Sequence, residues 1–392
     1  MSGRFGLEEV SAWAPDRWDE LAVRSPAGHA FQSHAWGELK RALGWTPRRY
    51  LFRAGGEIVA VASLQERPAL PVLAGLPLLP SRLLYAPRGP ILLRPDPEAA
   101  RAALDGLGAV ARERAALILT VDPAWEEDGP LAATFAPAGF RPADREIQVS
   151  RTATIVPLHP AEEDQHRLLG ASTANLINRA RRLGIVARQV DLADPVSREE
   201  PLAAFHALLA GTGDRRGFVV RAEGYLLDQW RRLGEARLAH LWFAVHDGRP
   251  VAGMLLLTCG RRLVLFQAGS DPGPGIPRAE ANRYLHWAVI RWAAANGYAE
   301  LDLGGVDTPT APGLPDGPGH PLWSLYQFKR SFGARGVSYV RAHERPANRL
   351  VAVAWRLARR ARAGRGRVTP GAPGGAAGSI PGSTPGRADP TG

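Results

Sequence analysis

Lysine is almost absent from this chain of 392 residues. Only Lys40 and Lys329 occur among its 49 basic residues, and the other 47 are arginines. The bias is a coding preference for arginine and says nothing about function by itself. It makes the two exceptions informative, because a retained lysine indicates chemistry that needs a compact ammonium on a flexible stem. The alternative is the chance survival of two solvated lysines.

Cysteine is equally scarce. The single Cys259 excludes a disulfide within the chain and any metal site built from several thiolates, and it fits a reducing compartment. The phosphate loop G-x-x-x-x-G-K-[ST], the nucleophile elbow G-x-S-x-G and the zinc motif H-E-x-x-H are also missing. These absences argue against a hydrolase or a metalloenzyme, and we expect no cofactor.

Long apolar runs are missing as well. The most apolar stretch, residues 70–93, is interrupted by prolines and two arginines, and residues 1–21 lack the apolar core of a signal peptide. We therefore expect a cytoplasmic protein. Its net charge of +11 and its pI near 10.6 favour anionic partners, namely nucleic acid, anionic lipid headgroups or phosphorylated small molecules.

One structural unit occurs twice in the sequence. Residues 50–66 and 239–259 each read as a strand, a glycine-containing turn and a second strand. A shift of 192 residues superimposes four positions of the two stretches, which are Gly56, Val59, Ala60 and Leu64 on Gly248, Val251, Ala252 and Leu256. The shared spacing predicts an internal duplication.

Each hairpin is followed by a strand, a helix and a further strand. These elements are expected at residues 82–93, 97–114 and 116–122 in the first half and at 262–271, 282–297 and 299–305 in the second. Their order resembles the acyltransferase fold of the GNAT type. It predicts an α/β (α+β) protein with two tandem GNAT-like domains, each a mixed sheet flanked by helices. Before the second helix, however, GSDPGPGIPRAEANRYLHW has prolines that remove the backbone donors with which such enzymes hold the pyrophosphate of CoA.

The C-terminal end changes character. Residues 347–363 form a basic amphipathic pattern, and we expect a helix there suited to RNA or to peripheral contact with an anionic membrane surface. Residues 364–392 are rich in glycine and proline and cannot bury a core, so we expect them to be disordered.

Seven sequence blocks carry a more specific resemblance. They are FQSHAWGELKRALGW (31–45), YAPRGPI (85–91), NRARRLGIVAR (178–188), DRRGF (214–218), PVAGMLLL (250–257), HWAVIRWAAANGYAELDLGGV (286–306) and LYQFKRSFGARGVSYV (325–340). Together, and in this order, they resemble the Fem family (FemABX type) of peptidoglycan interpeptide-bridge aminoacyltransferases. The match covers nearly the whole chain up to about residue 345.

The resemblance implies two fused GNAT-like domains. We expect the first over residues 1–150, completed by residues 335–346, and the second over residues 151–334. The implied donor is aminoacyl-tRNA in place of acyl-CoA. The implied acceptor is the stem-peptide amine of a lipid-linked or nucleotide-linked peptidoglycan precursor. A tRNA donor would account for the missing pyrophosphate-binding turn and for the basic balance of the chain.

The resemblance also gives both lysines a role. The lysine of the family's W-x-x-x-K block helps to hold the phosphate of the precursor and matches Lys40, one helical turn after Trp36, so both are expected to bind substrate. The lysine of the F-K-x-x-F block lies near the reacting centre and matches Lys329. An ammonium there would stabilise the oxyanion that forms when the acceptor amine attacks the ester, a contribution of about 3 kcal/mol. No general base is indicated, since Asp302 and Asp307 only end a strand and the tRNA ribose could relay the proton.

Four further residues are implied as substrate contacts, each with a structural alternative. Arg215 matches a family arginine that pairs with substrate phosphate, or it forms a structural salt bridge. Arg88 contacts the substrate or braces its turn. Tyr85 and Phe328 line the cleft or belong to the core.

Two other functions stay open at this level. The chain would be an acyl-CoA-dependent GNAT-type N-acyltransferase if its donor were not a tRNA. It would be a non-catalytic binder of muropeptide or RNA if it kept the fold without turnover. The fold alone does not separate these three functions.

Overall fold

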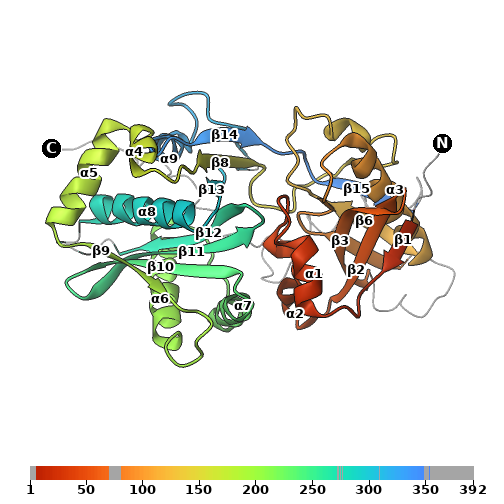
Figure 1. Ribbon diagram of the computed structural model, residues 1–392, viewed down its shortest axis with the longest axis horizontal. Coiled ribbons are helices and arrows are strands. Elements are labelled where there is room, and N and C mark those ends of the chain that lie inside the picture. The colour runs from red at the N-terminus through yellow and green to blue at the C-terminus, as the bar shows by residue number, and fades with distance from the viewer. Residues whose placement is uncertain are drawn as a thin grey trace, which may run out of the picture. The chain divides into compact units, whose positions relative to one another are not determined.

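The computed structural model describes residues 6–69, 81–271, 273, 275, 277–308, 310–347 and 353 (Figure 1). Its contacts divide the chain into two compact units. Unit 1 contains the chain up to Gln148, the turn Thr258–Arg261 and the segment from Ser338, and unit 2 contains Val149–Leu257 and Arg262–Val337. The helix predicted at 347–363 and the disordered tail predicted at 364–392 lie outside the described residues, apart from residues 347 and 353.

Unit 1 is built on one mixed sheet with the strand order β1-β2-β3-β4-β6-β15-β7, and β5 pairs with β3. The strands are β1 (Gly6–Glu9), β2 (Thr46–Ala54), β3 (Glu57–Pro68), β4 (Arg82–Ala86), β5 (Ile91–Leu92), β6 (Ala116–Val121), β7 (Arg141–Pro142) and β15 (His343–Pro346). β4 and β6 are parallel, and the other pairs are antiparallel.

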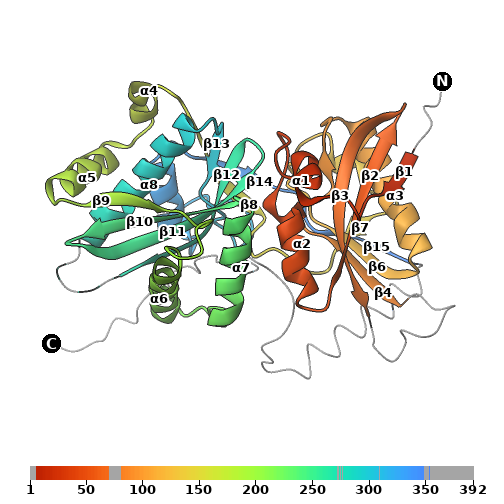
Figure 2. The same cartoon turned by 60° about the horizontal axis from the view of Figure 1, so that its bottom comes forward.

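Helices cover both faces of this sheet. α1 (Pro15–Ala22) and α2 (His34–Arg41) lie on one face, and α3 (Pro97–Glu113) lies on the other (Figure 2). Because side chains alternate along a strand, Tyr50 and Phe52 point to the same face, and they share a buried cluster with Leu104 of α3. α3 begins where Asp96 accepts a hydrogen bond from the backbone N–H of Ala99 at 2.8 Å, which is an N-cap.

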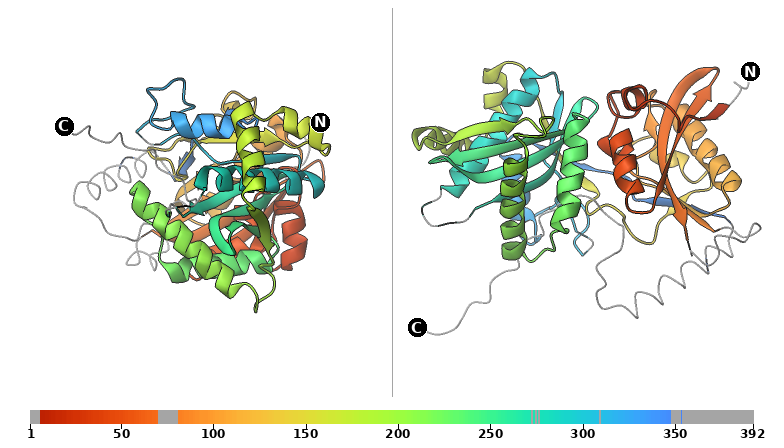
Figure 3. Two further views of the ribbon diagram at one scale, coloured as in Figure 1. Left: turned by 90° about the vertical axis from the view of Figure 1, so that its left-hand side faces the viewer. Right: turned by 90° about the horizontal axis from the view of Figure 1, so that it is seen from below.

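Unit 2 repeats the plan with the strand order β14-β8-β13-β12-β11-β10-β9. The strands are β8 (Thr152–Pro157), β9 (Val186–Val190), β10 (Ala239–His246), β11 (Arg249–Cys259), β12 (Arg262–Ser270), β13 (Glu300–Asp302) and β14 (Arg335–Ser338). Its helices are α4 (Glu162–Arg167), α5 (Ala171–Arg182), α6 (Glu199–Arg216), α7 (Glu223–Glu235), α8 (Arg278–Ala295) and α9 (Trp323–Arg330). α6 and α7 lie side by side on one face of the sheet, and α5 and α8 lie on the other (Figure 3).

Both predicted hairpins are formed, in equivalent positions. Gly55 and Gly56 turn β2 into β3, and Asp247 and Gly248 turn β10 into β11, all four with positive φ. Glycine adopts this backbone region without a steric penalty, and aspartate tolerates it better than most residues. β3 and β11 begin 192 residues apart, which is the shift that superimposes the two sequences.

The stretch predicted to complete the first domain, residues 335–346, is divided between the two units. β15 pairs with β6 in the sheet of unit 1, whereas β14 pairs with β8 in the sheet of unit 2. Only the second part of the stretch therefore completes unit 1. β14 and β15 are both short extended segments, and a short extended segment can join either sheet. The sequence pattern alone does not indicate which sheet each strand joins.

The parallel strands of the two units end differently. In unit 1 the pairing of β4 with β6 continues to the last residues, Ala86 opposite Val121. In unit 2 the pairing of β12 with β13 ends at Val264 opposite Asp302, although β12 continues to Ser270. β12 therefore extends past the end of β13, which pairs with it over its whole length.

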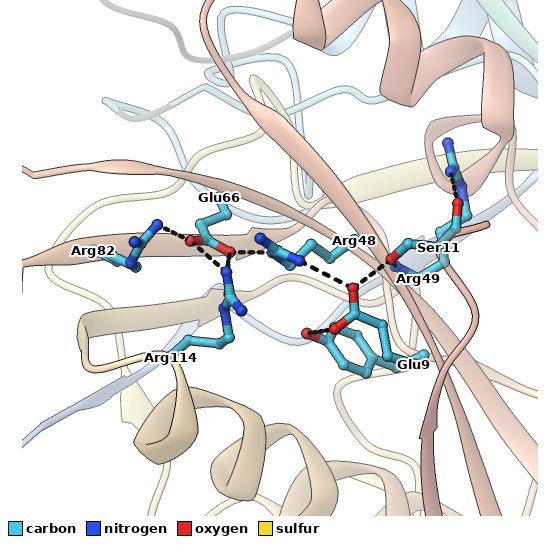
Figure 4. A network of polar contacts seen from close by, with 8 residues as sticks. Glu9, Ser11, Arg48, Arg49, Glu66, Arg82 and Arg114 are labelled. Atoms are coloured by element: carbon cyan, nitrogen blue, oxygen red, sulfur yellow. Dashed lines mark hydrogen bonds and ion pairs between the residues drawn. The ribbon is translucent and has the colours of Figure 1, made fainter.

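A buried carboxylate ties together three segments of unit 1. Glu66 of β3 is 1% exposed and accepts hydrogen bonds from Arg48 at 2.5 Å, from Arg114 at 3.0 Å and from Arg82 (Figure 4). Arg48 also reaches Glu9 of β1 at 3.0 Å. Burial acts to raise the pKa of Glu66, but the hydrogen bonds from Arg114 and Arg48 outweigh it and hold the pKa below 4.5.

Candidate functional site

Lys329 lies on α9 in unit 2, and its side chain is almost fully buried. Its Nζ donates hydrogen bonds to the backbone carbonyls of Gly304 at 2.9 Å and Gly305 at 2.8 Å. We call these two carbonyl groups the carbonyl seat. A Cβ built on Gly304 would lie 3.7 Å from Nζ and 3.8 Å from the carbonyl oxygen of Leu265. Lys329 therefore lies beside the segment that follows β13, next to β12.

The environment of Lys329 favours an uncharged amine. Burial lowers the pKa of Lys329 from 10.5 to about 7, and the carboxylates of Asp302 and Asp307 oppose this shift only in part. An arginine would keep its charge at this position and would present a planar fork instead of a single nitrogen. The retained lysine thus has a physical reason that a solvated surface lysine would lack.

Phe328 packs beside this lysine in an aromatic group. Its ring lies 5.4 Å from that of Phe332 and 5.1 Å from that of His286, and the guanidinium of Arg283 lies 5.2 Å from its centre. Burial lowers the pKa of His286 to about 4, so its ring is neutral at pH 7. Phe328 therefore forms part of the wall around Lys329, in a partly buried position.

Arg215 occupies the exposed last turn of α6. It donates to the Thr212 hydroxyl at 3.1 Å and to the backbone carbonyl of Ser270 at the end of β12. Burial lowers the pKa of the neighbouring Arg216, and the charges of Arg278 and Arg215 add to the effect. In the described part of the chain, the hydrogen-bond acceptors of Arg215 are thus a hydroxyl and a backbone carbonyl.

Lys40 and Trp36 lie in unit 1, one turn apart on α2. The Lys40 ammonium lies 4.5 Å from the centre of the Trp36 ring, and Phe31 stacks on the same indole at 4.2 Å. The Ser33 hydroxyl caps the helix by accepting from the backbone N–H of Trp36 at 3.0 Å. The spacing in the sequence thus translates into a lysine held over a buried tryptophan.

Tyr85 and Arg88 converge on a carboxylate. The Tyr85 hydroxyl donates to Oδ2 of Asp122 at 2.7 Å, and the backbone N–H of Arg88 donates to Oδ1 at 2.6 Å. The amide of Gln148 donates to both the Tyr85 hydroxyl, at 3.0 Å, and the carboxylate, at 2.9 Å. Burial raises the pKa of Asp122 and also raises the pKa of Tyr85 well above 10.

A glutamine links these two groups of unit 1. Gln32 donates to the Pro87 carbonyl at 2.7 Å and accepts from the Ser63 backbone N–H at 2.6 Å. It therefore ties the segment before Trp36 to the turn that carries Arg88. The predicted residues are thus divided between the units, with Trp36, Lys40, Tyr85 and Arg88 in unit 1 and Arg215, Phe328 and Lys329 in unit 2.

Sequence reasoning missed Asp122. The available signal was an acidic residue placed directly after an apolar strand, in ALILTV followed by Asp122 and Pro123. Only Asp302 and Asp307, at the corresponding place in the second half, were considered. The structure shows that the first half has its own buried carboxylate at the end of β6.

The site chemistry is that of amines, hydroxyls and carboxylates. Within the described ranges, no group of three or more histidine, cysteine, aspartate and glutamate side chains is arranged to hold a metal ion. None of the helices in the described part of the chain combines the length and the apolar character that a bilayer crossing requires.

Comparison with known proteins agrees with the sequence blocks. Residues 15–130 match the FemAB family, and residues 171–311 match the acetyltransferase (GNAT) domain. Over 237 residues the chain is 26% identical to the lipid II:glycine glycyltransferase of Staphylococcus aureus (strain MRSA252). The chain is thus similar to the FemAB family over much of unit 1. The aligned part makes up 58% of this chain and 53% of that protein, so the chain spans about half the length of the curated relatives it matches.

Solved structures confirm the predicted fold class. The crystal structure of FemX superimposes with a TM-score of 0.71 at 19% identity, over 89% of this chain and 99% of that chain. The C-terminal domain (DUF2156) of a putative lysylphosphatidylglycerol synthetase from Agrobacterium fabrum superimposes with a TM-score of 0.50 at 14% identity, over 88% and 95%. At these identities the likeness shows the fold alone, which is that of two GNAT-like domains.

Proposed function

We propose that this protein transfers an amino acid from aminoacyl-tRNA to the stem-peptide amine of a peptidoglycan precursor. The observation that carries the proposal is the buried amine of Lys329, held by the carbonyls of Gly304 and Gly305 just after the end of β13. The curated relatives, named lipid II:glycine glycyltransferases, indicate the class of acceptor. The reaction breaks the ester bond of the donor and forms an amide with the acceptor amine.

The reaction requires the protein to position the two substrates and to transfer one proton. The ester of an aminoacyl-tRNA is already activated, so holding the amine in line with the carbonyl supplies much of the rate. Lys329 is the catalytic residue of this proposal. Phe328 shapes its surroundings.

Basic residues of both units are proposed to bind phosphate. Lys40, steadied over Trp36, offers its ammonium to the phosphate of the precursor, and Tyr85 and Arg88 contact the same substrate. In unit 2, Arg215 lies with Arg216 and Arg278 in a group of like charges that an anion would stabilise. The net charge of +11 agrees with a tRNA donor.

Lys40→Ala is expected to weaken binding of the acceptor and to leave turnover nearly unchanged. A lost charge-assisted hydrogen bond corresponds to about 1.5–3 kcal/mol, which is roughly a 10- to 100-fold rise in KM for the precursor. Steady-state kinetics over a range of precursor concentrations measure this. Arg41→Ala is the matched control, because Arg41 is the next residue, is exposed and is paired with Glu38. A loss confined to kcat would contradict the binding role of Lys40.

A second candidate is transfer from acyl-CoA on the same scaffold, which the GNAT match over residues 171–311 favours. The donor separates the two. Transfer from a charged tRNA pool that stops after ribonuclease treatment supports the proposal. Transfer from acyl-CoA that is unchanged by ribonuclease treatment supports the alternative. Binding of RNA or muropeptide without any transfer indicates a non-catalytic protein.

Location follows from the proposed substrates. Charged tRNA and peptidoglycan precursors meet at the cytoplasmic side of the membrane, so we propose a cytoplasmic protein with peripheral membrane contact. The segment proposed for that contact, residues 347–363, lies outside the described residues apart from residues 347 and 353.

A further inference from the structure

The carbonyl seat matches an uncharged lysine amine. A protonated lysine presents three N–H donors, whereas the neutral amine presents two donors and one lone pair. Among the described residues, the structure gives Nζ of Lys329 two acceptors, the carbonyls of Gly304 and Gly305. Two acceptors satisfy both donors of a neutral amine and leave its lone pair for another group.

Residues of strand β8 make hydrogen bonds to the segment that carries the carbonyl seat. The Gly304 carbonyl accepts a second hydrogen bond from the Thr154 hydroxyl at 2.7 Å, and the Thr152 hydroxyl accepts from the Val306 backbone N–H at 2.8 Å. The Thr154 hydroxyl and the Lys329 amine thus donate hydrogen bonds to the same carbonyl oxygen, that of Gly304. A carbonyl that already accepts one hydrogen bond stabilises an ammonium less well than a free one.

Asp307 fixes the same loop to β8. Its carboxylate accepts from the Thr152 hydroxyl at 2.6 Å, from the backbone N–H groups of Arg151 and Thr152 at 3.1 Å each, and from the Ser150 hydroxyl. These bonds commit both carboxylate oxygens to β8 and its approach. Asp307 is therefore a positioning residue for the seat, and the charge of its carboxylate offsets only part of the effect of burial on the pKa of Lys329.

Both carbonyls of the seat belong to glycines that a side chain would not easily replace. Gly304 has a φ of +83°, a conformation that side chains rarely adopt. A Cβ on Gly305 would lie 1.6 Å from the Ser150 hydroxyl oxygen. The backbone thus favours glycine at position 304, and packing against Ser150 disfavours a side chain at position 305.

We propose that Lys329 is the general base of the transfer reaction, seated as a neutral amine by the carbonyls of Gly304 and Gly305, with Thr154 and Asp307 as positioning residues. This rests on the proposed function. The neutral acceptor amine attacks the ester carbonyl, a C–N bond forms, and the carbonyl π electrons move to oxygen. The proton of the attacking nitrogen passes to the lone pair of Lys329. The C–O bond then breaks, and Lys329 returns the proton to the ribose oxygen that leaves.

This sequence changes the role expected for Lys329. The sequence alone led us to expect a permanent ammonium that stabilises the oxyanion. In the mechanism proposed here the ammonium exists only after proton transfer, at the moment when the oxyanion is present. The charge therefore develops with the transition state and is absent from the ground state, which is the condition for catalysis.

The charged and titratable groups around Lys329 are few and identified. Among the described residues they are Asp302 at the end of β13, Asp307 in the loop and His286 on α8, which also lies near Arg283. His286 is neutral at pH 7, because burial lowers its pKa to about 4. A titration of Lys329 near pH 7 is therefore not masked by the imidazole.

The scarcity of lysine makes a direct test simple. Protein labelled with carbon-13 lysine gives side-chain NMR signals from two residues only, and Lys40→Arg assigns them. We expect the Lys329 signal to titrate near pH 7 and the acidic limb of kcat/KM to share its midpoint. In Thr154→Val both midpoints should move upward, because the freed Gly304 carbonyl stabilises the ammonium, and Thr154→Ser should restore them.

Three results would overturn the proposal. A Lys329 midpoint close to 10.5 would mean that the residue is an ammonium at neutral pH and cannot accept the proton. A midpoint near 7 with an activity profile that does not follow it would remove the base role and keep the neutral amine. A midpoint near 7 without transfer from any aminoacyl-tRNA would show that the proposed function itself is wrong, and the base role would fall with it.

Discussion

Lys329→Met is expected to abolish aminoacyl transfer without weakening the fold. Loss of a general base lowers the rate by about 100-fold to 10,000-fold. The free energy of unfolding should not fall. Methionine fills the same space without burying an amine, and Gly304 keeps its hydrogen bond from Thr154. Transfer kinetics and urea unfolding of the same preparations measure both effects.

The free energy of unfolding should depend on pH in a direction that the pKa of Lys329 determines. The pKa of Lys329 is about 7 in the folded protein and 10.5 in its ordinary state, so the unfolded chain binds more protons between these values. The stability of the wild-type protein should therefore gain a contribution as pH rises from 7 to 10.5, of at most roughly 5 kcal/mol. The methionine variant lacks this contribution and should be the more stable protein at pH 6.

Two companion variants make the result specific. Lys329→Arg should also be inactive, because a guanidinium stays charged and cannot accept the proton. Arg330→Met, one residue further along α9 at an exposed position, should keep its activity. A Lys329→Met variant that transfers at the wild-type rate, or that loses several kcal/mol of stability while the rate persists, would make Lys329 a structural residue.

Glu66→Gln is expected to destabilise unit 1 strongly. The substitution keeps the shape of the side chain but leaves the guanidinium groups of Arg48, Arg82 and Arg114 without their shared buried counter-charge (Figure 4). Removal of one partner from a buried charge group costs about 3–5 kcal/mol. Urea unfolding at pH 7 measures the loss, and Glu20→Gln serves as a control, because Glu20 is exposed and its contact with Arg24 is 3.7 Å.

The acid side of the stability curve tests the same group independently. The pKa of Glu66 is held below its ordinary value of 4.5, so the stability that its charge contributes is present above pH 4.5 and is lost as pH falls through the lower folded value. The wild-type protein should lose stability in this range more steeply than Glu66→Gln. Parallel curves, together with a loss below 1 kcal/mol at pH 7, would show that the arginines are satisfied by solvent.

The elements that the sequence predicted well are those with a local cause. Gly55, Gly56, Asp247 and Gly248 specify two turns because of their backbone preferences, and the alternation of apolar residues around them specifies the strands. The helices α3 and α8, which follow the hairpins, are marked by local residues as well. Asp96 caps the start of α3, and Gly297 follows the end of α8. Repetition of the same pattern 192 residues later then predicts the duplicated fold.

Features that depend on distant partners could not be predicted in this way. The division of residues 335–346 between two sheets depends on the strands β6 and β8, which are remote in the sequence. The partner of Tyr85 is Asp122, and the partners of Lys329 are two backbone carbonyls. Carbonyl groups exist at every residue and leave no trace in a sequence, so the seat becomes visible only in the structure.

The most direct test of the account is the mass of the acceptor after reaction. Purified lipid-linked and nucleotide-linked precursors would be incubated with a charged total tRNA pool, with wild-type protein and Lys329→Met in parallel and with ribonuclease in a third arm. The account predicts that the precursor gains the mass of one or more amino acid residues with the wild-type protein alone. A precursor that gains no mass from any aminoacyl-tRNA but is modified when acyl-CoA is supplied would contradict it.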